Sequence, residues 1–312
     1  MLQFYLSEEN SALYEVNNIQ KNCWINMIHP SEEEIRQVSS KLNIPLDFIV
    51  DALDNYERSR VERDEDKVLI IVDFPIVIHD EFHAESFETI PIGMIITEHN
   101  FITVCLKESP ILDGFINNHI KGFFTFKKSR FALQILQVIA SHYLRDLKLL
   151  NRKTDIAEKS LHESVQNKNL FELMNIEKSL VYFLTSLKSN KLVLDKVMRQ
   201  NFLKMYEDDD DLLDDVIIEM NQAIEMAGVH SSILSGMMDV YASIISNNMN
   251  DVMKFLTLFT IILTVPTLVF SFYGMNVDLP FEHTPLAWII TIVISLLLAA
   301  FLAWVFWKKK IF

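Results

Sequence analysis

The chain has 312 residues, 50% of them hydrophobic, and a formal net charge of −14 at pH 7. A chain this acidic is expected to bind nucleic acid poorly and could bind divalent cations. The commoner explanation of a negative net charge, however, is ordinary solubility. The two cysteines, Cys23 and Cys105, form no CxxC or zinc pattern, so we expect buried thiols and no disulfide. P-loop, Gly-x-Ser-x-Gly and His-Glu-x-x-His motifs do not occur, which argues against an enzyme.

Residues 1–125 contain short runs rich in Ile, Val and Phe separated by polar turns, which predicts an α/β domain. The predicted strands are Leu2–Leu6, Cys23–Met27, Val68–Phe74, Ile76–Ile78, Ile92–Thr97 and Phe101–Leu106. Pro75 separates the third run from the fourth, so this stretch is either two strands or one edge strand with a break. The polar residues Glu98 to Asn100 predict a hairpin between the last two strands.

Two helices are predicted in the same domain. Ser31 and Glu34 have the spacing of a capping box at a helix start, and Pro45–Asp54 predicts a second helix. The stretch from His79 to His83 could coordinate a metal, but a solvated turn fits better because nothing nearby completes a ligand set.

Residues 126–252 predict long helices, because no proline occurs between Ile111 and Val265 and glycine is rare. We expect helices over Lys127–Ser164 and Leu170–Gln200, with a break at Gln166–Asn169. A third helix is expected from Asp211 to Tyr273. At about 1.5 Å per residue this helix is roughly 90 Å long, far more than the thickness of a membrane, so we expect most of it to be a stalk outside the membrane. An apolar face near a 3.5-residue period, from Leu213 to Val252, indicates packing against helices of the same or of neighbouring subunits.

Two C-terminal segments are long enough to span a membrane. No charged residue occurs from Phe255 to Val277 or from Thr284 to Trp307, and each run exceeds the roughly 20 residues that a span requires. Lys254 and Lys308–Lys310 flank the two spans, whereas the loop Val277–Pro285 has no Lys or Arg. The positive-inside rule therefore predicts a multi-pass protein of the cell membrane with both termini in the cytoplasm.

The predicted organisation is α+β, in three parts. Residues 1–125 form a cytoplasmic α/β domain, residues 126–252 a helical hairpin and stalk, and residues 253–312 a transmembrane domain that contacts lipid. The spans are placed at about residues 255–273 and 286–307 from their lack of charge.

The first span carries a stripe of hydroxyl side chains. The spacings between Thr257, Thr260, Thr264, Thr267 and Ser271 are 3, 4, 3 and 4, which places them on one helix face. The same helical periodicity continues N-terminal to the span, through Met253, Asn250 and Ser246 to Asp239. Hydroxyls can simply bond to the preceding turn. Five in register favour a ring of helices with the stripe facing a pore.

Tyr273-Gly274-Met275-Asn276 ends the first span, and this tetrapeptide, with two terminal spans and a basic C-terminus, resembles the CorA family of magnesium channels and transporters. The resemblance extends upstream through Leu234-Ser235-Gly236, Asp239, Ser246-Asn247, Asn250, Met253, Lys254 and Leu256. It covers the layout of the whole chain, and the N-terminal third only in outline.

The resemblance implies a Mg²⁺ channel made of a homopentamer, with the first span of each subunit lining the pore and the second spans outside that ring. It assigns the selectivity filter to Tyr273, Gly274, Met275 and Asn276, where Gly274 permits the turn that presents the filter. Asn250, Met253, Leu256 and the hydroxyl stripe line the pore below it. Met253 is on the stripe and Leu256 lies one residue off it, and their apolar side chains could form a gate.

The resemblance also assigns a regulatory role to two carboxylates. Asp215 and Asp239 would bind cytoplasmic Mg²⁺ and hold the channel closed, with a partner carboxylate among Glu62, Asp64 and Asp66. Asp215 could instead be one more solvated charge. Mg²⁺ is the preferred ion because the pore candidates are oxygen ligands, which suit hard cations. The alternatives are a Zn²⁺, Co²⁺ or Ni²⁺ transporter of the same fold and a membrane-anchored scaffold without transport.

Overall fold

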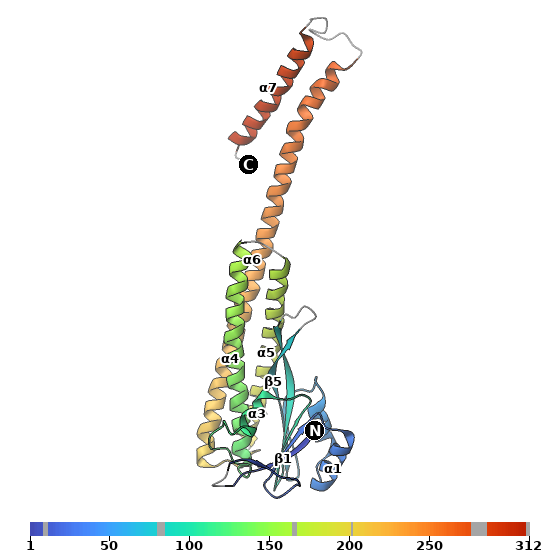
Figure 1. Cartoon of the computed structure of the whole chain (residues 1–312). Coiled ribbons are helices and arrows are strands. Elements are labelled where there is room, and N and C mark those ends of the chain that lie inside the picture. Colours follow the sequence, from blue (N-terminus) through green and yellow to red (C-terminus); the bar gives the residue numbers. More distant parts are fainter. Residues whose placement is uncertain (9–11, 80–84, 164–166, 201, 276–285, 310–312) are drawn as a thin grey trace. The chain divides into compact units, whose positions relative to one another are not determined.

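The computed structural model of the chain describes residues 1–8, 12–79, 85–163, 167–200, 202–275 and 286–309. These residues form two compact units, residues 1–235 and 236–312. The first unit holds the mixed α/β part and three long helices, and the second holds the end of the last of these helices and a further apolar helix (Figure 1).

The strands are β1 (Leu2–Leu6), β2 (Tyr14–Glu15), β3 (Trp24–Ile28), β4 (Arg60–Asp64), β5 (Lys67–His79), β6 (Glu85–Ile96) and β7 (Phe101–Cys105). The helices are α1 (Glu32–Leu42), α2 (Leu46–Val50), the 3₁₀ helix η1 (Asp51–Leu53), α3 (Pro110–Ile116), α4 (Lys128–Glu163), α5 (Asn167–Gln200), α6 (Glu207–Tyr273) and α7 (Ala287–Lys308).

The sheet has the order β2-β1-β3-β7-β6-β5-β4, in which only the β3–β7 pair is parallel. Side chains of successive strand residues point to opposite faces. On β3 and β7, Ile25 and Ile102 therefore pack with α1 and α2, whereas Trp24 and Phe101 contact Phe131 of α4 on the other face. The result is a sheet covered by short helices on one face and long helices on the other (Figure 1).

Gly93 of β6 allows the 3₁₀ helix η1 to lie against the sheet. A Cβ added at Gly93 would come within 2.4 Å of the Ala52 Cβ, so any side chain there would force the two elements apart. The close approach places Asp51, the first residue of η1, beside β4.

Most of the predicted elements are confirmed. The capping box at Ser31 and Glu34 is present, with Glu34 N donating to Ser31 Oγ and Ser31 N donating to Glu34 Oε2. The β6–β7 hairpin forms, but β6 begins at Glu85, seven residues before its predicted start at Ile92. A helix followed by a 3₁₀ turn after Pro45 and the three long helices form close to their predicted bounds, although α5 begins at Asn167, inside the predicted break. The thiols of Cys23 and Cys105 are free and fully buried.

The prediction at Pro75 was wrong in one respect, because β5 runs without a break from Lys67 to His79. Its pairing with β4 ends at Ile71, whereas its pairing with β6 continues to His79. Pro75 therefore lies where β5 is an edge strand, and its missing N–H breaks no ladder. Strands β2 and β4 and helix α3 were not predicted.

Helix α5 supplies side-chain partners where the β4 pairing of β5 ends. Asn190 Oδ1 accepts from Asp73 N at 2.9 Å, and Asn190 Nδ2 donates to Asp73 O at 2.7 Å. Nearby on the same helix, Ser179 Oγ accepts from Phe87 N at 3.0 Å. These bonds satisfy main-chain groups on the open edges of β5 and β6.

Candidate functional site

Two helices, α6 and α7, are long and apolar enough to cross a membrane. Within the two apolar segments, buried residues lie on one face of each helix. On α6 after Phe255 these are Leu258 and Val269, at 5% and 6% exposure, and on α7 they are Thr291 and Ser295, at 8% and 1%. Because both pairs of positions repeat at helical spacing, we infer that the two helices pack together through these faces.

The hydroxyl stripe lies on the other side of α6. At about 100° per residue, Thr260 is about 200° around the helix from Leu258. Thr260, Thr264 and Thr267 are all exposed in the chain taken alone. With Leu256, Phe259 and Leu263 they line a shallow groove of about 430 Å³ along α6. The stripe therefore belongs to a face of α6 that α7 leaves open.

Three stripe hydroxyls bond to the preceding turn. Thr260 Oγ1 donates to Leu256 O at 2.8 Å, Thr264 Oγ1 to Thr260 O at 2.7 Å, and Thr267 Oγ1 to Leu263 O at 3.2 Å. Each hydroxyl has a single hydrogen, which these bonds use, so the oxygen lone pairs remain for other donors. The open face of α6 thus presents a column of hydrogen-bond acceptors.

Pro266 lies inside α6, one residue before Thr267. Proline has no N–H, so the Ile262 carbonyl lacks its partner within the helix. Ile262 is four residues after Leu258, which places this carbonyl on the side that faces α7. The acceptor column on the open face is therefore not interrupted by Pro266.

Of the predicted filter residues, Tyr273 is the last residue of α6, and Gly274 and Met275 follow it. Gly274 N donates to Phe270 O at 2.9 Å, and Met275 N donates to Phe272 O at 3.3 Å. The turn uses no left-handed backbone at Gly274; instead a Cβ there would lie 3.2 Å from Phe270 O. Glycine thus supplies room beside the last carbonyls of the helix. Asn276 lies outside the described residues.

The other proposed pore residues are exposed on α6. Met253 and Leu256 are each 54% exposed, and Asn250, Thr257 and Ser271 are also exposed. Leu256 lies in the groove with the threonines, whereas Met253 is about one turn before it. Both side chains are available to a neighbouring helix or to a pore axis, so their role as a gate stays a prediction.

Asp215 and Asp239 are both exposed on α6, in the first and the second unit respectively. Among the described residues, no three His, Cys, Asp or Glu side chains form a group that could hold a metal. The stretch His79 to His83 falls largely outside the described residues. A cation site at Asp215 or Asp239 would therefore need groups beyond those that the described residues of one chain bring together.

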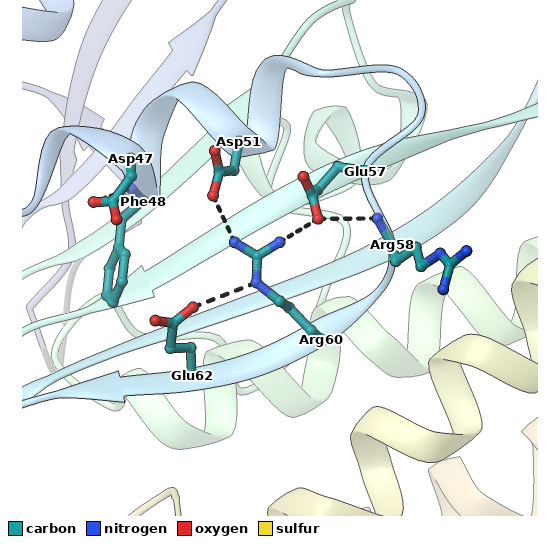
Figure 2. A network of polar contacts seen from close by, with 7 residues as sticks. All are labelled: Asp47, Phe48, Asp51, Glu57, Arg58, Arg60 and Glu62. Carbon is teal, nitrogen blue, oxygen red and sulfur yellow. Dashed lines mark hydrogen bonds and ion pairs between the residues drawn. The ribbon is translucent and has the colours of Figure 1, made fainter.

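Two of the three candidate partner carboxylates have a cation beside them. Glu62 accepts from Arg60 Nε at 3.4 Å, and Asp66 accepts from Lys67 Nζ at 2.9 Å. Arg60 also contacts Asp51 at 2.6 Å and Glu57, so three carboxylates surround one guanidinium (Figure 2). No local pattern in the sequence indicates this cluster.

Residues 20–310 match the family described as CorA-like Mg²⁺ transporter protein. The chain belongs to this family. It is 28% identical over 273 residues to the cobalt/magnesium transport protein CorA of Methanocaldococcus jannaschii, covering 85% of this chain and 81% of the relative. It is 23% identical to the protein of that name from Thermotoga maritima, covering 92% of this chain and 82% of the relative.

Solved structures show the same fold. The complete CorA magnesium transporter of M. jannaschii has a TM-score of 0.83 and 24% identity, over 98% of this chain and 97% of that one. The full-length CmaX protein has a TM-score of 0.71 at 13% identity, over 97% of both chains. The N-terminal α/β part, the long helix α6 and the apolar helix α7 are thus the elements of a CorA fold.

Proposed function

We propose that this protein carries Mg²⁺, with Co²⁺ as a second substrate, across the cell membrane. Membership of the family supports transport, and the names of the relatives supply the two ions. The observation in this chain that carries the proposal is the column of acceptor oxygens at Thr260, Thr264 and Thr267, on the face of α6 that α7 does not cover.

The chemistry of the column suits a hydrated cation. Mg²⁺ gives up its water shell reluctantly, so it passes most easily where the pore accepts hydrogen bonds from that water. Hydroxyl oxygens whose own hydrogens are engaged offer only lone pairs to such waters. The pore-lining positions Thr257 to Ser271 hold no His or Cys, which disfavours softer metals as the preferred substrate.

A single helix cannot enclose water, so the pore requires several copies of the chain. A homopentamer is the assembly that the family resemblance implies, with α6 innermost and α7 outside. The exposed apolar residues Val229, Ile233 and Val240 of α6, at 57%, 54% and 57% exposure, support contacts with neighbouring subunits. Their spacing of four and seven residues places them on one face.

The filter assignment rests on Asn276 together with Tyr273, Gly274 and Met275. Asn276 would bind the ion through its water shell at the outer mouth, beside a loop that carries Asp278 and Glu282 and no basic residue. With both termini in the cytoplasm, the membrane potential draws the cation inward by about 2.3 kcal/mol per charge per 100 mV. Transport therefore needs no enzymatic step.

Regulation by cytoplasmic Mg²⁺ is the second half of the proposal. Carboxylates brought together by assembly repel one another, and a divalent cation removes that repulsion. Mg²⁺ bound at Asp215 and Asp239 would stabilise the closed ring, and Met253 and Leu256 would then exclude water from the pore. Loss of Mg²⁺ would loosen the ring.

Uptake into liposomes tests the substrate assignment. The purified protein is reconstituted, and influx of Mg²⁺, Co²⁺, Ni²⁺ and Zn²⁺ is compared under an inside-negative potential. We expect Mg²⁺ and Co²⁺ to enter and Asn276→Ala to abolish uptake while leaving the assembly intact by size-exclusion chromatography. Zn²⁺ uptake without Mg²⁺ uptake would favour the alternative transporter, and no uptake of any ion would favour the scaffold.

A further inference from the structure

The first unit contains a cavity of about 980 Å³ whose lining includes none of the proposed pore or filter residues. Four separate segments form it: the β4–β5 turn, the β6–β7 turn, the beginning of α4 and the connection between α5 and α6. Its volume lies at the upper end of the range of about 300 to 1,000 Å³ that is usual for small-molecule sites.

Lysines gather at this cavity although the chain as a whole is acidic. Lys127 and Lys128 at the start of α4 and Lys204 after α5 all line it. Burial and the nearby charges of Lys204 and Lys21 lower the pKa of Lys128, whereas Glu98 acts in the opposite direction. Lys128 Nζ donates to the main-chain oxygen of Glu98, which leaves two of its three hydrogens for another acceptor.

Part of the negative charge at the cavity already has a cation beside it. Asp209, only 2% exposed, is paired with Arg130 at 3.2 Å, and Asp66 is paired with Lys67 at 2.9 Å. Glu65 and Glu98 are the remaining acidic residues of the lining. Three lysines line the same cavity, and their positive charges repel one another. An anion bound among the lysines would reduce this repulsion.

Aromatic side chains complete the lining. Phe202 is held by Arg63, whose guanidinium lies 5.0 Å from the ring centre and donates to Phe202 O at 3.0 Å. Phe126 and Tyr206 also line the cavity, and Tyr206 is 71% exposed. Flat apolar rings beside a group of lysines match a ligand that has both a planar ring system and phosphate groups.

We propose that this cavity binds a nucleoside polyphosphate. Lys127, Lys128 and Lys204 contact the phosphates, and Phe126 or Tyr206 stacks on the base. The cavity also joins the connection between α5 and α6 to the sheet turns, so an occupied site ties α6 to the α/β part of the first unit.

The test is calorimetric titration of the full-length protein in detergent, with EDTA present so that cation sites stay empty. The ligands are ATP, inorganic triphosphate and adenosine. We expect saturable ATP binding that weakens with added salt, and weaker binding of triphosphate because it has no base to stack. Lys128→Gln and Lys204→Gln should each weaken ATP binding about tenfold, the effect of losing one hydrogen bond to a charged group.

Lys159→Gln is the matched control, because Lys159 is exposed on the same helix about 45 Å from Lys128. Its ATP affinity should equal that of the wild type, and circular dichroism of each variant shows that it is folded. Absence of saturable ATP binding, or equal affinities in all three variants, would overturn the proposal. Triphosphate binding as tight as ATP binding would overturn the nucleoside part of it.

Discussion

Arg60 is the residue on which most charges converge in the described part of the α/β domain. Its guanidinium bonds to Asp51, Glu57 and Glu62, and its side chain is 27% exposed (Figure 2). Asp51 belongs to η1, whereas Arg60 and Glu62 belong to β4. Three carboxylates this close would repel one another without the cation, so Arg60 holds η1 to the edge of the sheet.

Arg60→Met should therefore destabilise the protein by about 1–3 kcal/mol, because partly buried carboxylates lose a charged partner. Denaturant unfolding of the variant measures this. The control is Arg36→Met, which removes an exposed pair with Glu32 on α1 and should cost about 0.5 kcal/mol or less. Equal effects of the two substitutions would show that the Arg60 cluster is no stronger than a surface ion pair.

Asp73 carries a partly buried carboxyl group on β5, among the polar side chains of α5. Burial raises the pKa of Asp73 above its ordinary value, and hydrogen bonds from Ser186 and Ser59 counteract part of the rise. Tyr143 of α4, whose hydroxyl donates to Asp73 O, lies beside it. The folded protein therefore binds this proton more tightly than the unfolded chain does.

The sign of the pH dependence follows from that difference. The contribution of Asp73 to stability is greatest at low pH and falls as pH rises from the unfolded pKa of about 3.9 to the raised folded pKa. Asp73→Asn keeps an acceptor and removes the titration. We expect its stability relative to the wild type to improve over this pH range and then level off, as measured by thermal unfolding. A difference independent of pH would contradict the raised pKa.

At the scale of the element, α6 combines two roles in one helix. The buried residues of α6 between Leu213 and Leu234 pack within the first unit. Ile245 and Val252, in contrast, are 37% and 62% exposed in the single chain. Towards its end one face packs with α7 and the opposite face carries the acceptor column. Packing and the proposed ion path thus lie on different sides of the same helix.

The proposed gate belongs to this helix. Met253→Asp would place a carboxylate at a constriction that works by excluding water, so we expect ions to leak at a Mg²⁺ concentration that closes the wild-type channel. Fluorescent measurement of Mg²⁺ influx into liposomes loaded with millimolar Mg²⁺ detects the leak. Met253→Leu, which keeps an apolar side chain, should stay closed. If the Asp variant stays closed as well, Met253 does not line the constriction.

Local patterns were enough to predict the long helices, the two spans and the hydroxyl stripe, because periodicity, capping residues and lack of charge are properties of neighbouring residues. The continuous strand β5 could not be predicted, since whether Pro75 breaks it depends on where the β4 pairing ends. The Arg60 cluster and the lysine cavity depend on how separate segments meet, which the sequence pattern does not contain. On sequence grounds, back-bonding of the threonines is an alternative to a pore. The structure shows the back-bonds, and the oxygen lone pairs that they leave are compatible with the proposed ion path.

At the scale of the whole molecule, the proposed regulation depends on carboxylates that an assembly of several chains would bring together. Mg²⁺ at millimolar concentration should protect the wild type from limited proteolysis, and Asp215→Ala should need several-fold more Mg²⁺ for the same protection. Asp214→Ala is the matched control, because Asp214 is the exposed neighbour of Asp215 on α6. Identical curves for wild type and Asp215→Ala would remove Asp215 from the regulatory site and leave Asp239.

The central claim is that the open face of α6 lines the ion path, and cysteine accessibility tests it most directly. Both native thiols are fully buried, so a single introduced cysteine reports alone. A cationic methanethiosulfonate should label Thr264→Cys and reduce its Mg²⁺ uptake at least about tenfold, because the adduct blocks the pore. Val269→Cys, on the face towards α7, should keep its uptake. Unchanged uptake by a fully labelled Thr264→Cys channel, or failure of that cysteine to react, would contradict the account.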